Sequence, residues 1–180
     1  MPTDSLVRIT TMSQWLKHLT TVGIFIFVGF ALSVLLVPEW FDTMVTIAYQ
    51  GIAYPSELTL FKRLGLILLL AGPFGSALYG LWNLRALFDC YGQGNILGRA
   101  PSRFIRAVGF AMVLNAVLTV LTFSLGSLLL TFDNPAGQKQ LAVSVSSDLF
   151  FVFLMGGLLL VIGHVLHEAS RISDENRQIV

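Results

Sequence analysis

Three histidines are the residues in this chain best suited to hold a metal ion or a haem. His164 and His167 form the pattern H-x-x-H-E with Glu168, and in a helix both rings lie on one face, where they can touch one metal. His18 is expected at the same side of the membrane and would complete a pair of ligands. The order of residues differs from the HExxH and HxxEH zinc-protease signatures. One hypothesis for the function is therefore a membrane redox or metal protein that uses these three histidines. The alternative is that the histidines simply lie at the depth of the lipid headgroups, and no cofactor is assigned.

The single thiol of the chain, Cys90, follows Asp89 directly. No histidine lies near it in the sequence, and a lone thiol without an activating base or cation is usually inert. The phosphate-binding and serine-hydrolase patterns GxxxxGK[ST] and GxSxG are absent, and Gly92-Gln93-Gly94 is better explained as a turn. The sequence therefore predicts that the protein is not an enzyme.

The composition predicts that lipid is the solvent of this chain. Of its 180 residues, 55% are hydrophobic and 12% are charged, and the mean hydropathy is +0.78. A soluble domain carries about 25% charged residues. The net charge of +1 gives no overall field that would attract nucleic acid, so no such partner is expected. The length fits a single membrane domain over residues 1–180.

Four apolar segments are long enough to cross a bilayer, since about 19 residues at 1.5 Å each cover a hydrocarbon core of ~30 Å. They cover residues 19–37, 64–82, 107–130 and 149–166, and none contains Asp, Glu, Lys or Arg. Ion-coupled carriers place such a residue near the midplane, so its absence counts against a secondary transporter. A small oligomeric channel or carrier stays open, and the oligomeric state is not predicted. The expected fold is all-α: a polytopic integral membrane protein with an antiparallel four-helix transmembrane bundle.

Two polar segments are predicted to extend the second and fourth spans as helices beyond the membrane. The first is the central loop, residues 85–106, in which Gly92 and Gly94 end one helix and Pro101 suits the first turn of the next. The second is the tail, residues 167–180. Between the first two spans, residues 41–49 are expected to form a short interfacial helix.

Lysine and arginine decide the predicted orientation. Eight of them fall on one side of the expected membrane and three on the other; the eight are Arg8, Lys17, Arg85, Arg99, Arg103, Arg106, Arg171 and Arg177, and the three are Lys62, Arg63 and Lys139. Because cytoplasmic loops carry the excess of positive charge, both termini and the central loop are expected in the cytoplasm. Lys62 and Arg63 are the discordant pair, and we expect them to snorkel to lipid headgroups.

Two sets of residues are predicted to make specific contacts, one in docking and one in helix packing. The docking set lies on the cytoplasmic loop and tail and would engage lipid headgroups or a protein partner: Arg85, Arg99, Arg103, Arg106, Arg171 and Glu175. The packing set is Gly72, Ser76, Gly80 and Asn115. The first three recur every four residues and let another helix approach closely, and the Asn115 amide is expected to face a neighbouring helix. A hinge or substrate path at the small residues is the alternative.

Short motifs in the central loop and tail resemble a known bacterial family of four-span membrane proteins, domain of unknown function 2975. The similar parts are LFDCYGQGNILGRAPSRFIRAVGF and the tail from Glu168 through Asp174-Glu175-Asn176 to Ile179-Val180. One departure is Gly92-Gln93-Gly94, where the family more often has an arginine or lysine before the glycine. The resemblance implies the inner membrane and, often, a neighbouring gene for a helix-turn-helix regulator. It supplies no catalytic residues. The favoured hypothesis is a non-enzymatic inner-membrane protein, embedded in the bilayer, that docks a cytoplasmic regulatory partner.

Overall fold

The computed structural model describes residues 4–54, 58–95, 99–135 and 137–178, and describes side chains within residues 7–172 of these ranges. Five helices are present there: α1 (Asp4–Leu36), α2 (Pro38–Ala48), α3 (Leu60–Gly92), α4 (Arg99–Leu130) and α5 (Ser147–Gln178). The helices α1, α3, α4 and α5 are long and apolar enough to cross a membrane. The predicted all-α, multi-pass membrane fold is confirmed.

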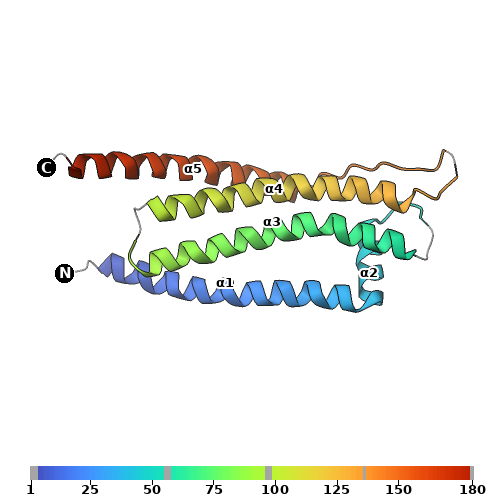
Figure 1. Ribbon diagram of the computed structural model, residues 1–180, viewed down its shortest axis with the longest axis horizontal. Coiled ribbons are helices and arrows are strands. Elements are labelled where there is room, and N and C mark those ends of the chain that lie inside the picture. Colours follow the sequence, from blue (N-terminus) through green and yellow to red (C-terminus); the bar gives the residue numbers. More distant parts are fainter. Residues whose placement is uncertain (1–3, 55–57, 96–98, 136, 179–180) are drawn as a thin grey trace.

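The four long helices pack antiparallel, in chain order, as a single open layer (Figure 1). Helix α1 contacts α3, α3 contacts α4, and α4 contacts α5, while α2 contacts α1. The central positions therefore belong to α3 and α4. The start of α1, the end of α5 and the α3–α4 connection lie at one end of the layer, which we call the terminal face. Helix α2 and the two longer connections lie at the opposite end, which we call the α2 face.

Each long helix exceeds the thickness of a bilayer. With 32 or 33 residues, each reaches about 48–50 Å, against ~30 Å for the hydrocarbon core. Helix α2 starts at Pro38, directly after α1 ends, and turns across the layer there (Figure 1), as an interfacial helix does. We therefore place one membrane boundary near α2, which leaves about 20 Å of helix beyond the other boundary at the terminal face.

The helices continue past the apolar segments from which they were predicted. The central loop is mostly helical, because α3 continues to Gly92 and α4 begins at Arg99. Gly94 has a φ of 79°, a left-handed conformation that favours glycine, and it turns the chain after α3. Residues 96–98 of this loop lie outside the described ranges. The predicted interfacial helix over residues 41–49 corresponds to α2.

Glycine brings α4 and α5 together backbone against backbone. A Cβ atom at Gly109 would lie 2.7 Å from the carbonyl oxygen of Gly156, and one at Gly156 would lie 2.9 Å from the amide nitrogen of Val113. Such distances leave no room for a side chain, and neither backbone can move without separating the helices. Gly157, the next residue, faces open space. Close packing through small residues, rather than exclusion of water, therefore holds these helices together in lipid.

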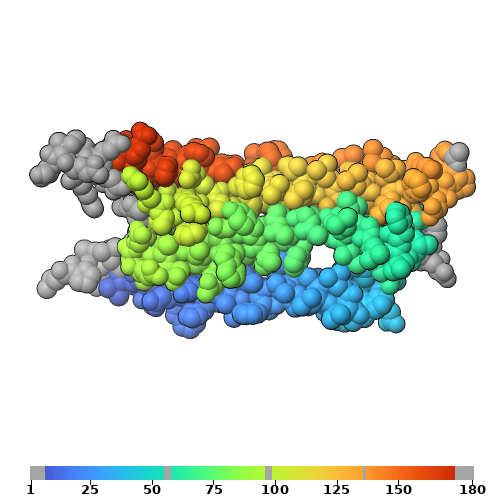
Figure 2. Space-filling view, viewed as in Figure 1, coloured from blue at the N-terminus to red at the C-terminus, as the bar shows by residue number. Residues whose placement is uncertain are grey.

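The contact between α1 and α3 is looser toward the α2 face. The rings of Phe27 and Phe74 stack with centroids 4.5 Å apart, and Lys17 binds Asp89 near the terminal face. The space-filling view shows an opening between α1 and α3 close to α2 (Figure 2). The layer is therefore held most firmly along α3, α4 and α5.

We predict that Gly156→Val destabilises the protein by about 1–3 kcal/mol, because its branched side chain overpacks the α4–α5 contact. The matched control is Gly157→Val, which places the same side chain one residue away in open space and should change stability by less than about 0.5 kcal/mol. Unfolding of both variants in detergent measures the difference. Equal losses of stability would mean that the close α4–α5 contact is not formed.

Candidate functional site

A proline in the middle of α3 creates the first of three polar sites. Pro73 has no amide hydrogen, so the carbonyl oxygen of Leu69 loses its partner within the helix. The hydroxyl of Thr122 on α4 donates a hydrogen bond of 3.0 Å to that oxygen. An unsatisfied carbonyl inside a bilayer costs several kcal/mol, roughly. The α3–α4 contact therefore repairs a gap that the sequence of α3 creates.

Asn115 makes the second link to the same turn of α3. Its side-chain amide donates to the carbonyl oxygen of Pro73 at 2.7 Å and to the hydroxyl of Ser76 at 3.0 Å. The Ser76 hydroxyl in turn donates to the Pro73 oxygen at 2.9 Å. Because Asn115 and Thr122 are seven residues apart, they share one face of α4. Together they bond α4 to α3 on both sides of the proline.

The small residues predicted for helix packing also face α4. A Cβ atom at Gly80 would lie 3.1 Å from that of Ala111, and one at Gly72 would lie 3.6 Å from the side chain of Leu118. Ser76, between them, is buried. These contacts surround the hydrogen bonds of Asn115. We call the α3–α4 contact around Asn115 and Thr122 the polar seam, and Gly72, Ser76 and Gly80 pack against α4 there.

Helix α2 is anchored to the same region of α4 by a tyrosine. The hydroxyl of Tyr49 donates to the carbonyl oxygen of Thr122 at 3.2 Å, and its ring stacks on Phe123 with centroids 5.1 Å apart. The absence of a side chain at Gly126 makes room for the hydroxyl. Burial raises the pKa of Tyr49 to about 12, so the hydroxyl keeps its proton and acts as donor at physiological pH.

The second polar site, at the α2 face, contains Lys62 and Arg63. The prediction that Lys62 snorkels to headgroups is wrong: the residue is 3% exposed. Its amine donates to the carbonyl oxygen of Leu130 at the end of α4 and forms an ion pair with Asp133, both at 3.0 Å. Arg63 donates to both carboxylate oxygens of Asp42, at 2.8 and 2.9 Å. Lys62 therefore binds the last carbonyl oxygen of α4, and both cations pair with carboxylates from other parts of the chain.

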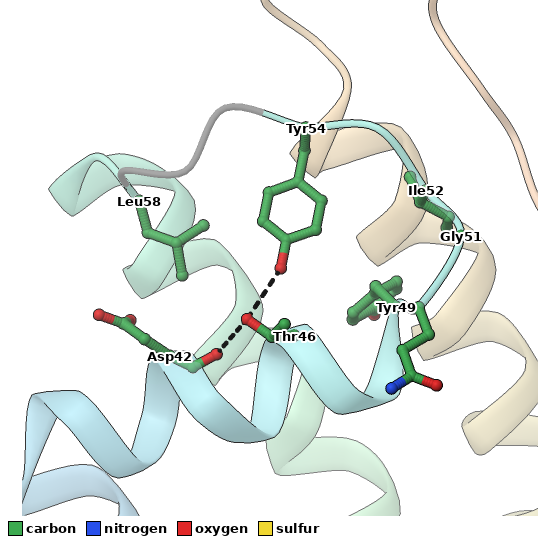
Figure 3. A pocket seen from close by; sticks show the side chains of 8 residues that line it. Asp42, Thr46, Tyr49, Gly51, Ile52, Tyr54 and Leu58 are labelled. Carbon is green, nitrogen blue, oxygen red and sulfur yellow. Dashed lines mark hydrogen bonds between the residues drawn. The ribbon is translucent and has the colours of Figure 1, made fainter.

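A pocket of about 390 Å³ lies beside this ion pair, between α2 and the chain that follows it (Figure 3). The hydroxyl of Tyr54 reaches down to that of Thr46 at 3.3 Å, and Thr46 donates to the backbone oxygen of Asp42 at 2.9 Å. The carboxylate of Asp42 is already bound by Arg63. The pocket therefore offers a ligand both polar and apolar groups, from Thr46, Tyr49, Gln50, Ile52, Tyr54 and Leu58. The sequence analysis did not predict this pocket, although two tyrosines on either side of a glycine, Tyr49 and Tyr54 around Gly51, are a pattern that could have indicated it.

The third polar site is the terminal face, where polar contacts tie α1 to α3. The amine of Lys17 lies 2.6 Å from the carboxylate of Asp89. The guanidinium of Arg85 donates through Nε to the hydroxyl of Thr21 at 2.9 Å and lies over the ring of Trp82. Arg85, predicted for docking, is therefore engaged in holding two helices together.

The other predicted docking residues lie on α4 and α5. Arg99, Arg103 and Arg106 are spaced to share one face at the start of α4. Arg103 is exposed, whereas Arg106 is half-buried and its Nε has no hydrogen-bond partner among the described residues. On α5, Arg171 pairs with Glu168 at 2.6 Å. The side chain of Glu175 lies outside the described residues.

Comparison with known proteins identifies the family of the chain. A family model described as "Protein of unknown function (DUF2975)" matches residues 44–180. The chain belongs to the DUF2975 family. The match includes α3, α4 and α5 with the whole polar seam, whereas α1 lies before it. No curated protein and no solved structure matches the chain.

In this DUF2975 chain the three histidines are not brought together. His18 lies on α1, and α3 and α4 separate it from His164 and His167 on α5. The Nδ1 atom of His164 lies 2.8 Å from the carbonyl oxygen of Leu160 in its own helix, and that of His167 lies 3.5 Å from the Ser102 hydroxyl. Over the described ranges, no group of three or more His, Cys, Asp or Glu side chains is placed to hold a metal.

We predict that Asn115→Leu destabilises this DUF2975 protein by about 0.6–1.7 kcal/mol, the range measured for hydrogen bonds between membrane helices. Asn83→Leu is the control, because the amide of Asn83 donates to the Tyr79 carbonyl of its own helix and, among the described residues, to no other helix. Unfolding in mixed detergent should separate the two variants. If both behave alike, the Asn115 bonds to α3 contribute nothing.

Proposed function

We propose that this protein is a non-enzymatic protein of the bacterial inner membrane that docks a cytoplasmic regulatory partner on its terminal face. The observation that carries the proposal is the asymmetry of the helices. About 20 Å of α1 extends past the bilayer at the terminal face, while α2 lies across the layer near the other boundary (Figure 1). A rigid helical platform on one side of a membrane is suited to binding a protein.

The charges support a cytoplasmic terminal face. The basic residues there are the eight counted in the sequence, and the positive-inside rule counts lysine and arginine rather than net charge. On the α2 face, Lys62 and Arg63 are paired with Asp133 and Asp42, and Lys139 lies over the Phe132 ring. The discordant cations therefore have structural partners of their own.

The tail offers a surface for a partner. Ser170 is buried toward the rest of the protein, whereas Ile172 is 50% exposed. Ile172 lies seven residues beyond Val165, at the end of the apolar span, so it extends the apolar edge of α5 into the tail beside the ion pair of Arg171 with Glu168. An exposed apolar edge flanked by charge is typical of a surface that binds another protein.

For the orientation, we predict that reporter domains fused after Pro38, Gly94, Pro135 and Val180 report outside, inside, outside and inside the cell, in that order. The reason is the excess of lysine and arginine at the terminal face. The assay uses paired reporters that are active on opposite sides of the membrane. An external Gly94 fusion would reverse the orientation and remove the cytoplasmic platform.

For docking, we predict that Ile172→Asp and a chain ending at Glu168 both lose the proteins that copurify with the intact chain from native membranes. A carboxylate at position 172 breaks the apolar edge of the tail. Val7→Asp is the matched control, since Val7 is equally exposed at the terminal face but lies on α1. The proposal fails if the intact chain, the two tail variants and the Val7→Asp control all insert equally and copurify with the same proteins.

A further inference from the structure

The apolar segment of α5 is not level with that of its neighbours. Gly163 packs against Arg106, which precedes the apolar part of α4. At the other end, Leu149 lies beside Val120, well inside that part. Because α4 continues to Leu130, α5 begins roughly 15 Å short of the end of α4. Figure 1 shows the same offset, with an extended chain in place of helix beside the last turns of α4.

This offset puts polar groups at the depth of lipid tails. Asp148, in the first turn of α5, lies at a depth where a carboxylate is costly. The extended residues 139–146 lie along α4, where the backbone amide of Ala142 donates a hydrogen bond to the Ser127 hydroxyl at 2.9 Å. Val143 and Val145 are both 66% exposed. Non-helical backbone is tolerated in a bilayer only where protein or water covers it.

The facing surfaces of α4 and α5 have the same seven-residue spacing of small residues. Small, buried residues recur every seven positions on both helices: Ser102, Gly109 and Ala116 on α4, and Gly156, Gly163 and Ser170 on α5. A shift of seven residues corresponds to two helical turns and keeps the same face toward the partner. The two surfaces therefore fit each other in more than one register.

We propose that α5 has two packing registers on α4, the observed register and an outward register displaced by seven residues toward the α2 face. In the outward register Gly163 takes the place of Gly156 opposite Gly109, and Gly156 lies opposite Ala116. The slide is about 10 Å. It brings the apolar segment of α5 nearer to level with those of α3 and α4, and it moves Asp148 about 10 Å closer to the end of α4.

The slide has two structural consequences. Residues 139–146 leave the surface of α4, because α5 now covers it. The distance from the end of α4 to the start of α5 becomes shorter, so these residues no longer need to be extended. Ser170 takes the place of Gly163, where a Cβ atom would lie 2.5 Å from Cγ of Arg106, 3.0 Å from its amide nitrogen and 3.2 Å from the carbonyl oxygen of Ser102. The stem of Arg106 therefore moves aside, and the two backbones separate there by a few tenths of an ångström. Discrete sliding of one packed element past another is an established type of switch. The inference does not depend on docking, although the tail moves with α5 in one piece.

Pairs of cysteines distinguish the registers in a Cys90→Ser background, which removes the natural thiol. Ala116→Cys with Phe153→Cys reports the observed register, because both residues line one groove. Ala116→Cys with Leu160→Cys reports the outward register, since Leu160 lies seven residues beyond Phe153. Ala116→Cys with Leu166→Cys fits neither register and is the control.

Each pair is oxidised in vesicles of dimyristoleoyl or dieicosenoyl phosphatidylcholine, which form thin and thick bilayers. We expect disulfides in the first two pairs and none in the control, with product shifting from the observed to the outward pair as the bilayer thickens. Asp148→Asn should shift product back toward the observed register, because the polar group at lipid depth no longer carries charge.

Three results would each overturn the two-register proposal. The first is that the outward pair fails to form in both bilayers, which means a fixed observed register. The second is that only the outward pair forms in both. The third is that the control pair crosslinks as well as the others, which means that α5 packs loosely and not at heptad positions.

Discussion

The structure depends on one constraint, that every backbone polar group inside a bilayer needs a partner within the protein. Pro73 breaks this rule in α3 by removing a donor in the middle of the apolar segment. Thr122 supplies the missing donor to Leu69 from the neighbouring helix, and Asn115 bonds the carbonyl of the proline itself. A helix that is incomplete alone becomes complete only when α4 lies beside it. The pairing of α3 with α4 is therefore fixed in position, orientation and register.

The remaining elements are placed relative to this pair. Tyr49 anchors α2 to α4 beside Thr122, and Lys62 closes the end of α4 through Leu130. On the other side, the middle of α5 packs on α4 through Gly109, Gly156 and Gly163, and toward the terminal face Ser102 lies 3.5 Å from His167. In the middle of the spans, the α3 side of α4 is thus held by directional bonds, whereas among the described residues the α5 side is packed there through glycine. This difference allows a change of register for α5 and not for α3.

The sequence predicts those features that depend on local pattern. Length and hydropathy are sufficient for the four spans, and the spacing of Gly72, Ser76 and Gly80 is sufficient to indicate a face of α3 that admits another helix. Pairings between distant residues are not predictable in this way. The snorkelling prediction for Lys62 failed because Asp133 is 71 positions away and nothing in the local sequence connects them. The offset of α5 was missed for a related reason, since helix register follows from backbone contacts such as that of Gly109 with Gly156.

A double-mutant cycle of Pro73→Ala with Thr122→Val tests the central claim most directly. With Pro73 present, removing the Thr122 hydroxyl leaves the Leu69 carbonyl without a donor and should cost about 1–2 kcal/mol. Alanine at position 73 restores an amide donor to that carbonyl, so Thr122→Val should then cost close to nothing, a coupling of about 1 kcal/mol between the two sites. The same loss of stability on both backgrounds would show that Thr122 does not complete α3, and the account of the α3–α4 pair would be wrong.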